Sequence, residues 1–293
     1  MAVETTGRPL GAPGGVSGRF LRRRGAVASL VFLVLVAVSS VAGPALWRYT
    51  YADLTPELLA PPSALHPLGT DALGHDVLAQ VMRGAQRSLA IALIVALVST
   101  AAGATVGLLA GYLGGWLDAL VMRLVDVLLT IPLIAVLGLV AVRLGGNGNG
   151  WLIVAFAVSA FYWAPIARII RGITLSLRER DFVAAARLIG AGTPRVLARH
   201  LLPHIVGPVA VVVTTYVAAA ISLESSLSFL GLGVQPPDTS LGQLVGAGTG
   251  FAVTAPWLFY APSLIVIAIV LAVHFVGEGL RRSFEAGGTG AAR

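Results

Sequence analysis

The chain has 293 residues, of which 57% are hydrophobic and only 11% are charged, with a mean hydropathy of +0.88. A soluble domain carries about 25% charged residues, so this composition excludes an ordinary soluble protein and indicates a membrane protein. The absence of cysteine excludes disulfides and thiol catalysis, and the absence of lysine excludes a P-loop ATPase, whose lysine contacts the phosphates. The net charge of +7 is distributed unevenly along the chain and gives no reason to expect a nucleic-acid partner.

Apolar segments that are long enough to cross a bilayer recur along the chain, because about 20 helical residues span the hydrocarbon core. Six such segments occur, at residues 26–46, 88–111, 119–142, 151–170, 205–229 and 258–280. The first follows an Arg-Arg-Arg triplet, as a signal sequence would, but its apolar run is too long and no clear cleavage site follows. We therefore expect an all-α, polytopic membrane protein with six transmembrane helices.

The distribution of arginine predicts the orientation, because cytoplasmic loops of membrane proteins are enriched in basic residues. With a cytoplasmic N-terminus, 16 of the 20 basic residues are cytoplasmic, and the others are Arg48, Arg83, Arg87 and Arg143. Both termini are then cytoplasmic. The expected organisation is a cytoplasmic N-terminal tail (1–25), a first span (26–46), an extracytoplasmic segment (47–87), a transmembrane domain (88–280) and a cytoplasmic C-terminal tail (281–293).

Residues 171–204, between the fourth and fifth spans, are too polar for a bilayer but favour helix. Glu179 and Asp181 suit a helix N-terminus, Gly190 suits a helix stop, and Pro194 suits the first turn of a second helix. The pattern predicts two short helices separated by a glycine break at the cytoplasmic face. Two roles fit this segment: an amphipathic loop on anionic lipid headgroups, or a docking element for a cytoplasmic partner.

The same segment resembles the EAA loop of ABC-importer permeases, in which an EAA triplet is followed by Gly and later by Leu-Pro. Here Ala184-Ala185-Ala186, Gly190 and Leu202-Pro203 stand at the family's spacing. Ala184 replaces the usual Glu, so the contact of that carboxylate falls to Glu179 or Asp181. The resemblance implies an ATPase-docking, or coupling, loop formed by Glu179, Asp181, Phe182, Ala184, Ala185, Ala186, Arg187 and Gly190.

Four further motifs resemble the peptide-importer branch of these permeases, and specifically its second, C-type permease. They are HPLGTDALGHD (His66–Asp76), MRLVDVLLTIP (Met122–Pro132), ESSLSFLGLGVQPPDTSLG (Glu224–Gly242) and GEGLRRSFE (Gly277–Glu285). The likeness covers roughly residues 20–286. The outer segment departs from the family pattern, with His75 in place of Arg, Ala79-Gln80 in place of Ser-Arg, and Gln86 in place of Arg.

The resemblance implies a permease of the dipeptide, oligopeptide and nickel importer family, forming half of a translocation pathway for peptides or similar solutes. The resemblance also implies that this subunit is not an enzyme. The implied partners are a homologous second permease, two cytoplasmic ATP-binding subunits and an extracytoplasmic substrate-binding protein, in a bacterial cytoplasmic membrane. No cofactor is expected in this chain; ATP and Mg²⁺ belong to the partner ATPases. Nickel, haem or glutathione remain alternative cargoes. A secondary transporter or channel is the alternative class, although the inverted repeats typical of secondary carriers are not found.

Polar residues inside the expected spans have two interpretations. Glu224, with Ser228, lies near the outer end of the fifth span. It either lines the translocation pathway or caps the helical turn that follows it, since a carboxylate in a bilayer needs a cavity or a partner. Arg123 and Asp126 are three residues apart on one helix face, which predicts a structural ion pair. Pro132 predicts a kink in the same span.

The outer segment contains two histidines and two aspartates whose side chains are suitable metal ligands. These are His66, Asp71, His75 and Asp76. The glycines between them indicate turns, in which aspartate side chains accept hydrogen bonds from nearby backbone amides. We therefore expect a structural role and no metal site.

Overall fold

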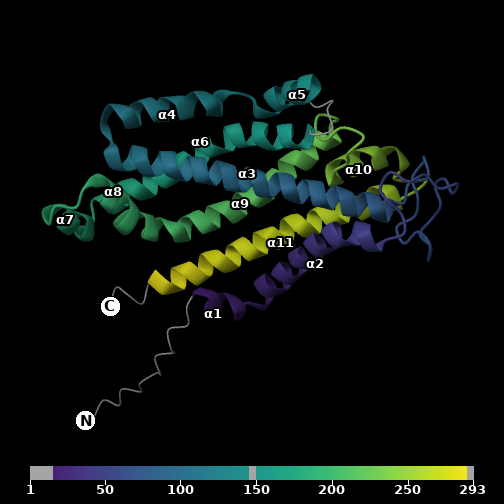
Figure 1. Cartoon of the computed structure of the whole chain (residues 1–293), viewed down its shortest axis with the longest axis horizontal. Helices are drawn as coiled ribbons and strands as arrows, with labels where there is room; N and C mark the ends of the chain where they lie inside the picture. The colour runs from purple at the N-terminus through teal and green to yellow at the C-terminus, as the bar shows by residue number, and fades with distance from the viewer. Residues whose placement is uncertain (1–15, 145–149, 289–293) are drawn as a thin grey trace, which may run out of the picture.

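The computed structural model describes residues 16–144 and 150–288, and Figure 1 shows these residues folded into a bundle of helices. Within them the only β-type pairing is an isolated bridge between Thr70 and Asp76. The expected all-α class is therefore confirmed. Three stretches lie outside the described residues: 1–15 and 289–293 in the predicted tails, and 145–149 between the third and fourth predicted spans.

Long helices form the bundle, and shorter ones lie at its ends or at breaks. The long helices are α2 (Arg24–Leu46), α3 (Val77–Leu113), α6 (Gly150–Arg178), α9 (Leu202–Phe229) and α11 (Trp257–Gly288). The shorter ones are α1 (Val16–Leu21), α4 (Gly115–Thr130), α5 (Leu133–Leu144), α7 (Asp181–Leu188), α8 (Thr193–Arg195), the π-helical η1 (Val196–Leu201), α10 (Leu241–Gly248) and the 3₁₀-helical η2 (Thr249–Phe251).

Five of the helices in the described residues are long and apolar enough to cross a membrane, or six if a bent pair counts as one span. The bent pair is α4 with α5, which meet at 78° where the sequence predicts one span over 119–142. Pro132 explains the break, because proline cannot donate a backbone hydrogen bond and disfavours a helical residue before it. Ile131 accordingly has extended backbone angles of −75° and 130°. The expected kink is a sharp break.

Several helices extend beyond the spans that hydropathy predicts. Helix α3 begins at Val77 rather than at residue 88, α6 continues to Arg178, and α11 continues to Gly288. The 37 residues of α3 are about 55 Å long at about 1.5 Å per residue, which exceeds the thickness of the hydrocarbon core. Hydropathy marks only the part inside the bilayer, whereas capping groups determine where a helix begins and ends.

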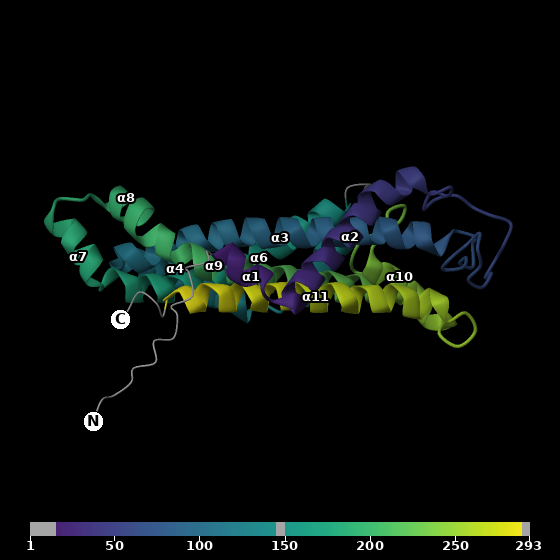
Figure 2. The same cartoon turned by 90° about the horizontal axis from the view of Figure 1, so that it is seen from below.

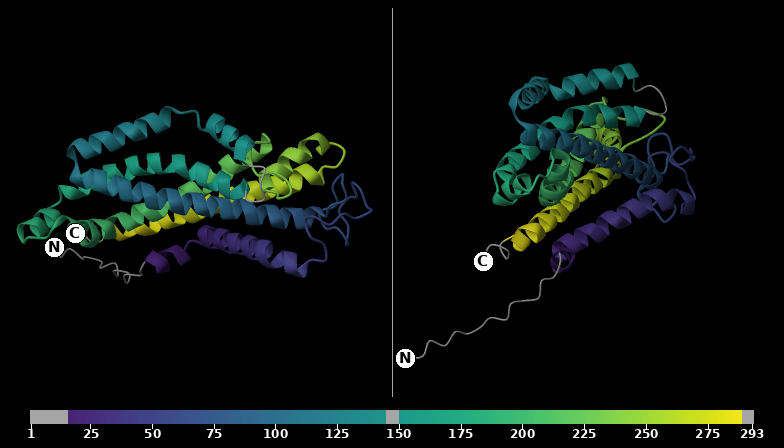
Figure 3. Two further views of the ribbon diagram at one scale, coloured as in Figure 1. Left: turned by 45° about the horizontal axis from the view of Figure 1, so that its top comes forward. Right: turned by 60° about the vertical axis from the view of Figure 1, so that its left-hand side comes forward.

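Helix α3 lies at the centre of the bundle and packs on α6, α9, α2 and α10 (Figures 1 and 3). Its contact with α6 depends on Gly103, Gly107 and Gly111, which are four residues apart and share one face. A Cβ on Gly103 or Gly107 would lie 2.6 or 2.4 Å from a carbonyl oxygen of α6. These glycines therefore let the two helix backbones touch, as small residues do between membrane helices.

The two ends of the bundle differ in character (Figure 2). One end carries the loop over residues 47–76 together with α10, and the other carries α7 and α8. Helix α1 and the last turns of α11 lie toward the α7 end. This arrangement brings the arginine-rich segments of the chain toward one end of the molecule, and the cytoplasmic location of that end stays a prediction.

Candidate functional site

The predicted short helix and its glycine stop both occur. Helix α7 ends in a Schellman motif, in which the Gly190 N–H donates to the Arg187 carbonyl and the Ala191 N–H donates to the Ala186 carbonyl, each at 3.0 Å. Gly190 has a φ of +82°, in the left-handed region that favours glycine. No atom outside the neighbouring residues lies within 4 Å of the position of a Cβ on Gly190. The glycine is therefore required by backbone conformation and not by crowding within this chain.

One face of α7 is anchored in an apolar cluster at this end of the bundle. Val183 is 0% exposed and Ala186 is 3% exposed. The other buried members come from α6, η1 and α9, and they are Ile166, Ile170, Val196, Leu201 and Ile205. The Phe182 ring stacks on the His204 ring at 4.7 Å between centroids. Helix α7 is thereby in direct contact with two long helices, α6 and α9.

Two arginine side chains connect the coupling loop to the C-terminal end of α3. The Arg187 guanidinium lies over the Tyr112 ring, 5.0 Å from its centroid. Arg178 donates to the Gly111 carbonyl at 3.0 Å and pairs with Glu179 at 2.9 Å. Of the predicted docking residues, Phe182, Ala186 and Arg187 therefore contact the chain's own helices.

The opposite face of α7 is open. Asp181, Ala184, Ala185 and Gly190 are exposed, so these predicted docking residues lie on one free surface. Asp181 makes no ion pair with any other residue in the described part of the chain, whereas Glu179 is bound to Arg178. Asp181 is therefore the better placed of the two to supply the carboxylate that Ala184 lacks.

Sequence reasoning missed two residues on this free surface. Leu188 is 89% exposed and Ile189 is 86% exposed. Large apolar side chains that are this exposed, at the polar end of a membrane protein, favour contact with another protein. The sequence signal for them was an apolar pair, Leu188-Ile189, which directly precedes the glycine stop and lies outside the EAA triplet.

The second of the two short helices predicted within residues 171–204 follows the prediction in part. It starts at Thr193 with Pro194 in its first turn and runs without interruption into α9. Between Val196 and Leu201 it is π-helical, and the Leu202 N–H bonds to the Leu197 carbonyl. Pro203 follows at once, and the wider turn accommodates a residue that cannot continue the ordinary hydrogen-bond ladder.

The predicted ion pair between Arg123 and Asp126 is wrong, because Asp126 pairs with a different arginine. Asp126 pairs with Arg168 of α6, and Arg123 is exposed on α4. A second pair joins the same two helices, between Asp118 and Arg171. Spacing on one helix cannot reveal a partner that a neighbouring helix supplies, and here α6 supplies both arginines.

Glu224 and Ser228 do not face a pathway in this structure, and Glu224 does not cap a new turn, because α9 continues to Phe229. Glu224 is 0% exposed; its carboxylate accepts hydrogen bonds from the Ser228 hydroxyl at 2.7 Å and from the Ser88 hydroxyl at 2.9 Å. The Ser88 hydroxyl in turn accepts from the Leu241 N–H at 3.2 Å. The network joins α3, α9 and the start of α10, so we replace the pathway prediction with a structural role.

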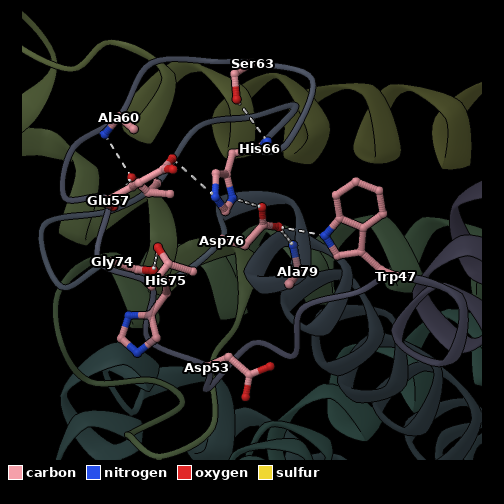
Figure 4. A network of polar contacts seen from close by, with 12 residues as sticks. Trp47, Asp53, Glu57, Ala60, Ser63, His66, Gly74, His75, Asp76 and Ala79 are labelled. Atoms are coloured by element: carbon pink, nitrogen blue, oxygen red, sulfur yellow. Dashed lines mark hydrogen bonds and ion pairs between the residues drawn. The ribbon is translucent and has the colours of Figure 1, made fainter.

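The outer histidines and aspartates form two separate hydrogen-bonded pairs. In Figure 4 the Trp47 and His66 rings both point at the carboxylate of Asp76, at 3.1 and 2.7 Å. Asp76 also caps α3 by accepting from the Ala79 N–H at 2.8 Å. His75 pairs with Asp71 at 2.8 Å. No group of three or more potential ligands within residues 16–144 and 150–288 could hold a metal ion.

A third polar cluster ties α3 to the loop before α10. Asp238 accepts from Arg83 at 2.8 Å and from Arg87 at 2.5 Å. The Arg83 and Arg87 guanidinium groups also lie over the rings of Tyr51 and Trp151, at 4.9 and 4.4 Å. The outer end of the molecule is therefore stabilised by charged contacts between segments that are far apart in sequence.

Comparisons with known proteins agree with this arrangement. A family described as "Binding-protein-dependent transport system inner membrane component" matches residues 103–286. A family described as "N-terminal TM domain of oligopeptide transport permease C" matches residues 16–62. The two matches together include the first span, the coupling loop and the last long helix.

Curated relatives match over nearly the whole chain. The oligopeptide transport system permease protein OppC of Mycobacterium tuberculosis is 43% identical over 268 residues, which cover 91% of this chain and 92% of the relative. OppC of Salmonella typhimurium is 39% identical over 270 residues, covering 91% and 88%. A putative peptide permease protein of Brucella suis is 39% identical over 274 residues, covering 92% and 89%.

Family membership implies ATPase and binding-protein partners and a multi-pass location in the inner membrane. It also assigns to this chain the non-catalytic, transmembrane part of the transporter. The chain belongs to the family of binding-protein-dependent transport system inner membrane components, the permease subunits of ABC importers.

Proposed function

We propose that this chain is one of two permease subunits in an ATP-driven importer of oligopeptides. It pairs with a homologous second permease to enclose the translocation pathway, and it receives solute from an extracytoplasmic binding protein. Two cytoplasmic ATPases bind ATP and Mg²⁺, and this chain binds no cofactor. Similarity to curated relatives named for oligopeptide transport supports the choice of oligopeptides over nickel, haem or glutathione.

The free surface of α7 is the proposed docking site for an ATPase. The observation that carries this proposal is the contrast between the two faces of the helix. Val183 and Ala186 are buried against α6, η1 and α9, whereas Leu188 and Ile189 are almost fully exposed. One face of α7 is thus held in the bundle, and the other is apolar and exposed. Such a helix can bind a partner protein and transmit its movement to the bundle.

The same contacts explain how movement of an ATPase would reach the membrane spans. The Schellman motif closes the last turn of α7, so the helix resists bending when its free surface is pushed. Its buried face touches residues of both α6 and α9. A displacement of α7 would therefore move these two long helices together and change the shape of the pathway between the permeases.

The proposed orientation places α7, both termini and the arginine-rich segments in the cytoplasm. The distribution of arginine supports it, and so does the presence of α1, α7 and the end of α11 toward the same end of the bundle. The loop over residues 47–76 and α10 then lie outside, where a binding protein would approach.

Substitution of the exposed apolar pair tests the docking proposal. Leu188→Glu with Ile189→Glu places two charges on the free surface without touching the buried face of α7. We expect normal membrane insertion, loss of the ATPases from the purified complex and loss of oligopeptide uptake. Val253→Glu is the control for ATPase retention, since Val253 is 93% exposed but lies near η2 at the other end of the bundle, and this variant should keep the ATPases. Retention of the ATPases by the double variant would refute the docking site.

The cargo is tested separately, through the extracytoplasmic partner. Mass spectrometry of the ligand that the purified binding protein retains should identify oligopeptides. Retention of a metal complex, haem or glutathione would refute the proposed cargo and leave the docking site on α7 unaffected.

A further inference from the structure

Helix α9 has an exposed face that consists of hydroxyl residues. Between residues 207 and 228, the exposed side chains are Thr215, Ser222 and Ser226. Their spacing of seven and four residues places them on one face of the helix. Ala218 and Ala219, which are small, lie between them and are partly exposed. This face is therefore both shallow and polar.

The exposed faces of two other long helices are different. The exposed large side chains in the central part of α2 are apolar and include Val34 and Val38. Those of α11 include Leu264 and Leu271, with the polar His274 beside them. Such faces suit contact with lipid chains. Polar residues inside membrane spans usually face the bundle interior or a water-filled cavity. Helices α2 and α3 each expose one hydroxyl residue, Ser39 and Thr105, whereas α9 exposes three on one face and is therefore less suited to lipid there.

The hydroxyl groups on this face are arranged as hydrogen-bond acceptors. Thr215 donates to the Val211 carbonyl at 3.1 Å, Ser222 to the Ala218 carbonyl at 3.0 Å, and Ser226 to the Ser222 carbonyl at 2.8 Å. Each hydroxyl proton is thereby used within α9, while the lone pairs of each oxygen can still accept. A row of uncharged acceptors matches the N–H groups of a peptide backbone and does not select among side chains.

The polar face continues into a groove at the outer end of the span. The groove has a volume of about 460 Å³ and lies between α9, α10 and α11, with Ser225, Ser226, Phe229, Val245 and Ser263 among its lining residues. This volume falls in the range of small-molecule sites, about 300–1,000 Å³. The Ser225 hydroxyl oxygen is enclosed and has no hydrogen-bond partner among the described residues. Ser226 belongs to both the groove and the polar face, so the two are continuous.

We propose that Thr215, Ser222 and Ser226, together with Ser225 in the groove, form the wall that α9 contributes to the solute path. Their hydroxyl oxygens accept hydrogen bonds from the backbone N–H groups of a peptide in transit. The inference rests on the proposed function, since it assigns the solute of that same importer to a specific surface. It replaces Glu224 and Ser228, which face into the bundle on the other side of α9.

The absence of cysteine from the chain allows a direct test. Thr215→Cys, Ser222→Cys and Ser226→Cys each introduce one thiol into this subunit with little change in size. The complete transporter, in proteoliposomes with its binding protein, is treated with a positively charged, membrane-impermeant methanethiosulfonate reagent. Val38→Cys is the matched control, because Val38 is 57% exposed on the apolar face of α2. The unsubstituted chain reports any reaction of thiols in the partner subunits.

Reaction at positions 215, 222 and 226 with loss of oligopeptide uptake, slowed by excess transported peptide, is the expected result. The Val38→Cys control should not react. Failure of the three positions to react in both the resting and the ATP-driven states would overturn the inference, while normal uptake by the unsubstituted transporter would leave the proposed function intact. Reaction only with an uncharged, lipid-soluble maleimide would identify a lipid-facing surface and also overturn it. Absence of oligopeptide uptake by the unsubstituted transporter would instead refute the proposed function, and the inference with it.

Discussion

Gly190→Val perturbs the coupling loop at one backbone position without adding a clash. Gly190 has a φ of +82°, and no atom outside its neighbours lies within 4 Å of a Cβ built there. A residue other than glycine in this conformation costs about 1–2 kcal/mol, and a β-branched residue costs more. If the backbone instead leaves the left-handed region, the two closing hydrogen bonds of the Schellman motif are lost, at about 0.5–1.5 kcal/mol each.

Both routes lead to a penalty of about 2 kcal/mol, which shifts the equilibrium between capped and frayed α7 about 30-fold toward the frayed form. The free surface of α7 would then lose its fixed shape, whereas the membrane spans would be unaffected. We expect normal abundance in the membrane, loss of co-purifying ATPases and loss of uptake. Gly190→Asn should retain much more activity, because Asn tolerates left-handed backbone better than Val.

Gly172→Val is the matched control for this experiment. Gly172 lies within α6, where a Cβ would meet no atom within 4 Å and the backbone does not have a positive φ. Uptake by this variant should stay near that of the unsubstituted chain. Normal uptake by Gly190→Val would refute the argument that the capped end of α7 transmits force from the ATPases.

Three further substitutions test the packing and the polar networks through the thermal stability of the purified complex. Gly107→Leu should destabilise it by about 1–3 kcal/mol or prevent its assembly, because a Cβ there would lie 2.4 Å from the Ala167 carbonyl oxygen; an unchanged melting temperature would refute close contact of α3 with α6. Glu224→Ala should cost about 2–4 kcal/mol and Glu224→Gln much less, because Gln keeps the shape, accepts from one serine through its amide oxygen and can donate to the hydroxyl oxygen of the other through its amide nitrogen; equal effects would contradict the network. Asp238→Ala should cost about 3 kcal/mol, because it leaves Arg83 and Arg87 without their shared carboxylate, and an unchanged stability would show that this contact is not formed.

Much of the fold follows from the sequence because the bilayer imposes a strong constraint on it. A helix must satisfy its backbone hydrogen bonds internally and present apolar side chains, so long apolar runs reveal where it crosses. The coupling loop is predictable for a different reason, since Gly190 and Pro194 are local signals that act on their own backbone. The break at Pro132 was predicted as a kink, but its size depends on how α5 packs afterwards.

Contacts between helices were the part that sequence reasoning could not supply. Asp126 has a suitable partner three residues away, yet its position facing α6 brings it to Arg168. Leu188 and Ile189 look like ordinary apolar residues of a helix, and only the burial of Val183 and Ala186 shows that they lie on the free side. In each case the missing information is which face of a helix meets its neighbour.

In helix α9, too, the sequence does not show which polar face meets a neighbouring helix, and the structure does. Ser222 and Glu224 are two residues apart, so they point in directions about 200° apart on a helix with about 100° per residue, and the pair of Ser226 and Ser228 repeats this arrangement. The sequence therefore contains two polar faces on one membrane helix, each of which needs either partners in the bundle or contact with water. The hydrogen bonds of Glu224 to Ser88 and Ser228 give the first face its partners. Among the described residues no group donates a hydrogen bond to the hydroxyl oxygens of the second face, which themselves donate to carbonyls of α9. A solute path alongside this face would supply the donors that these exposed oxygens can accept from.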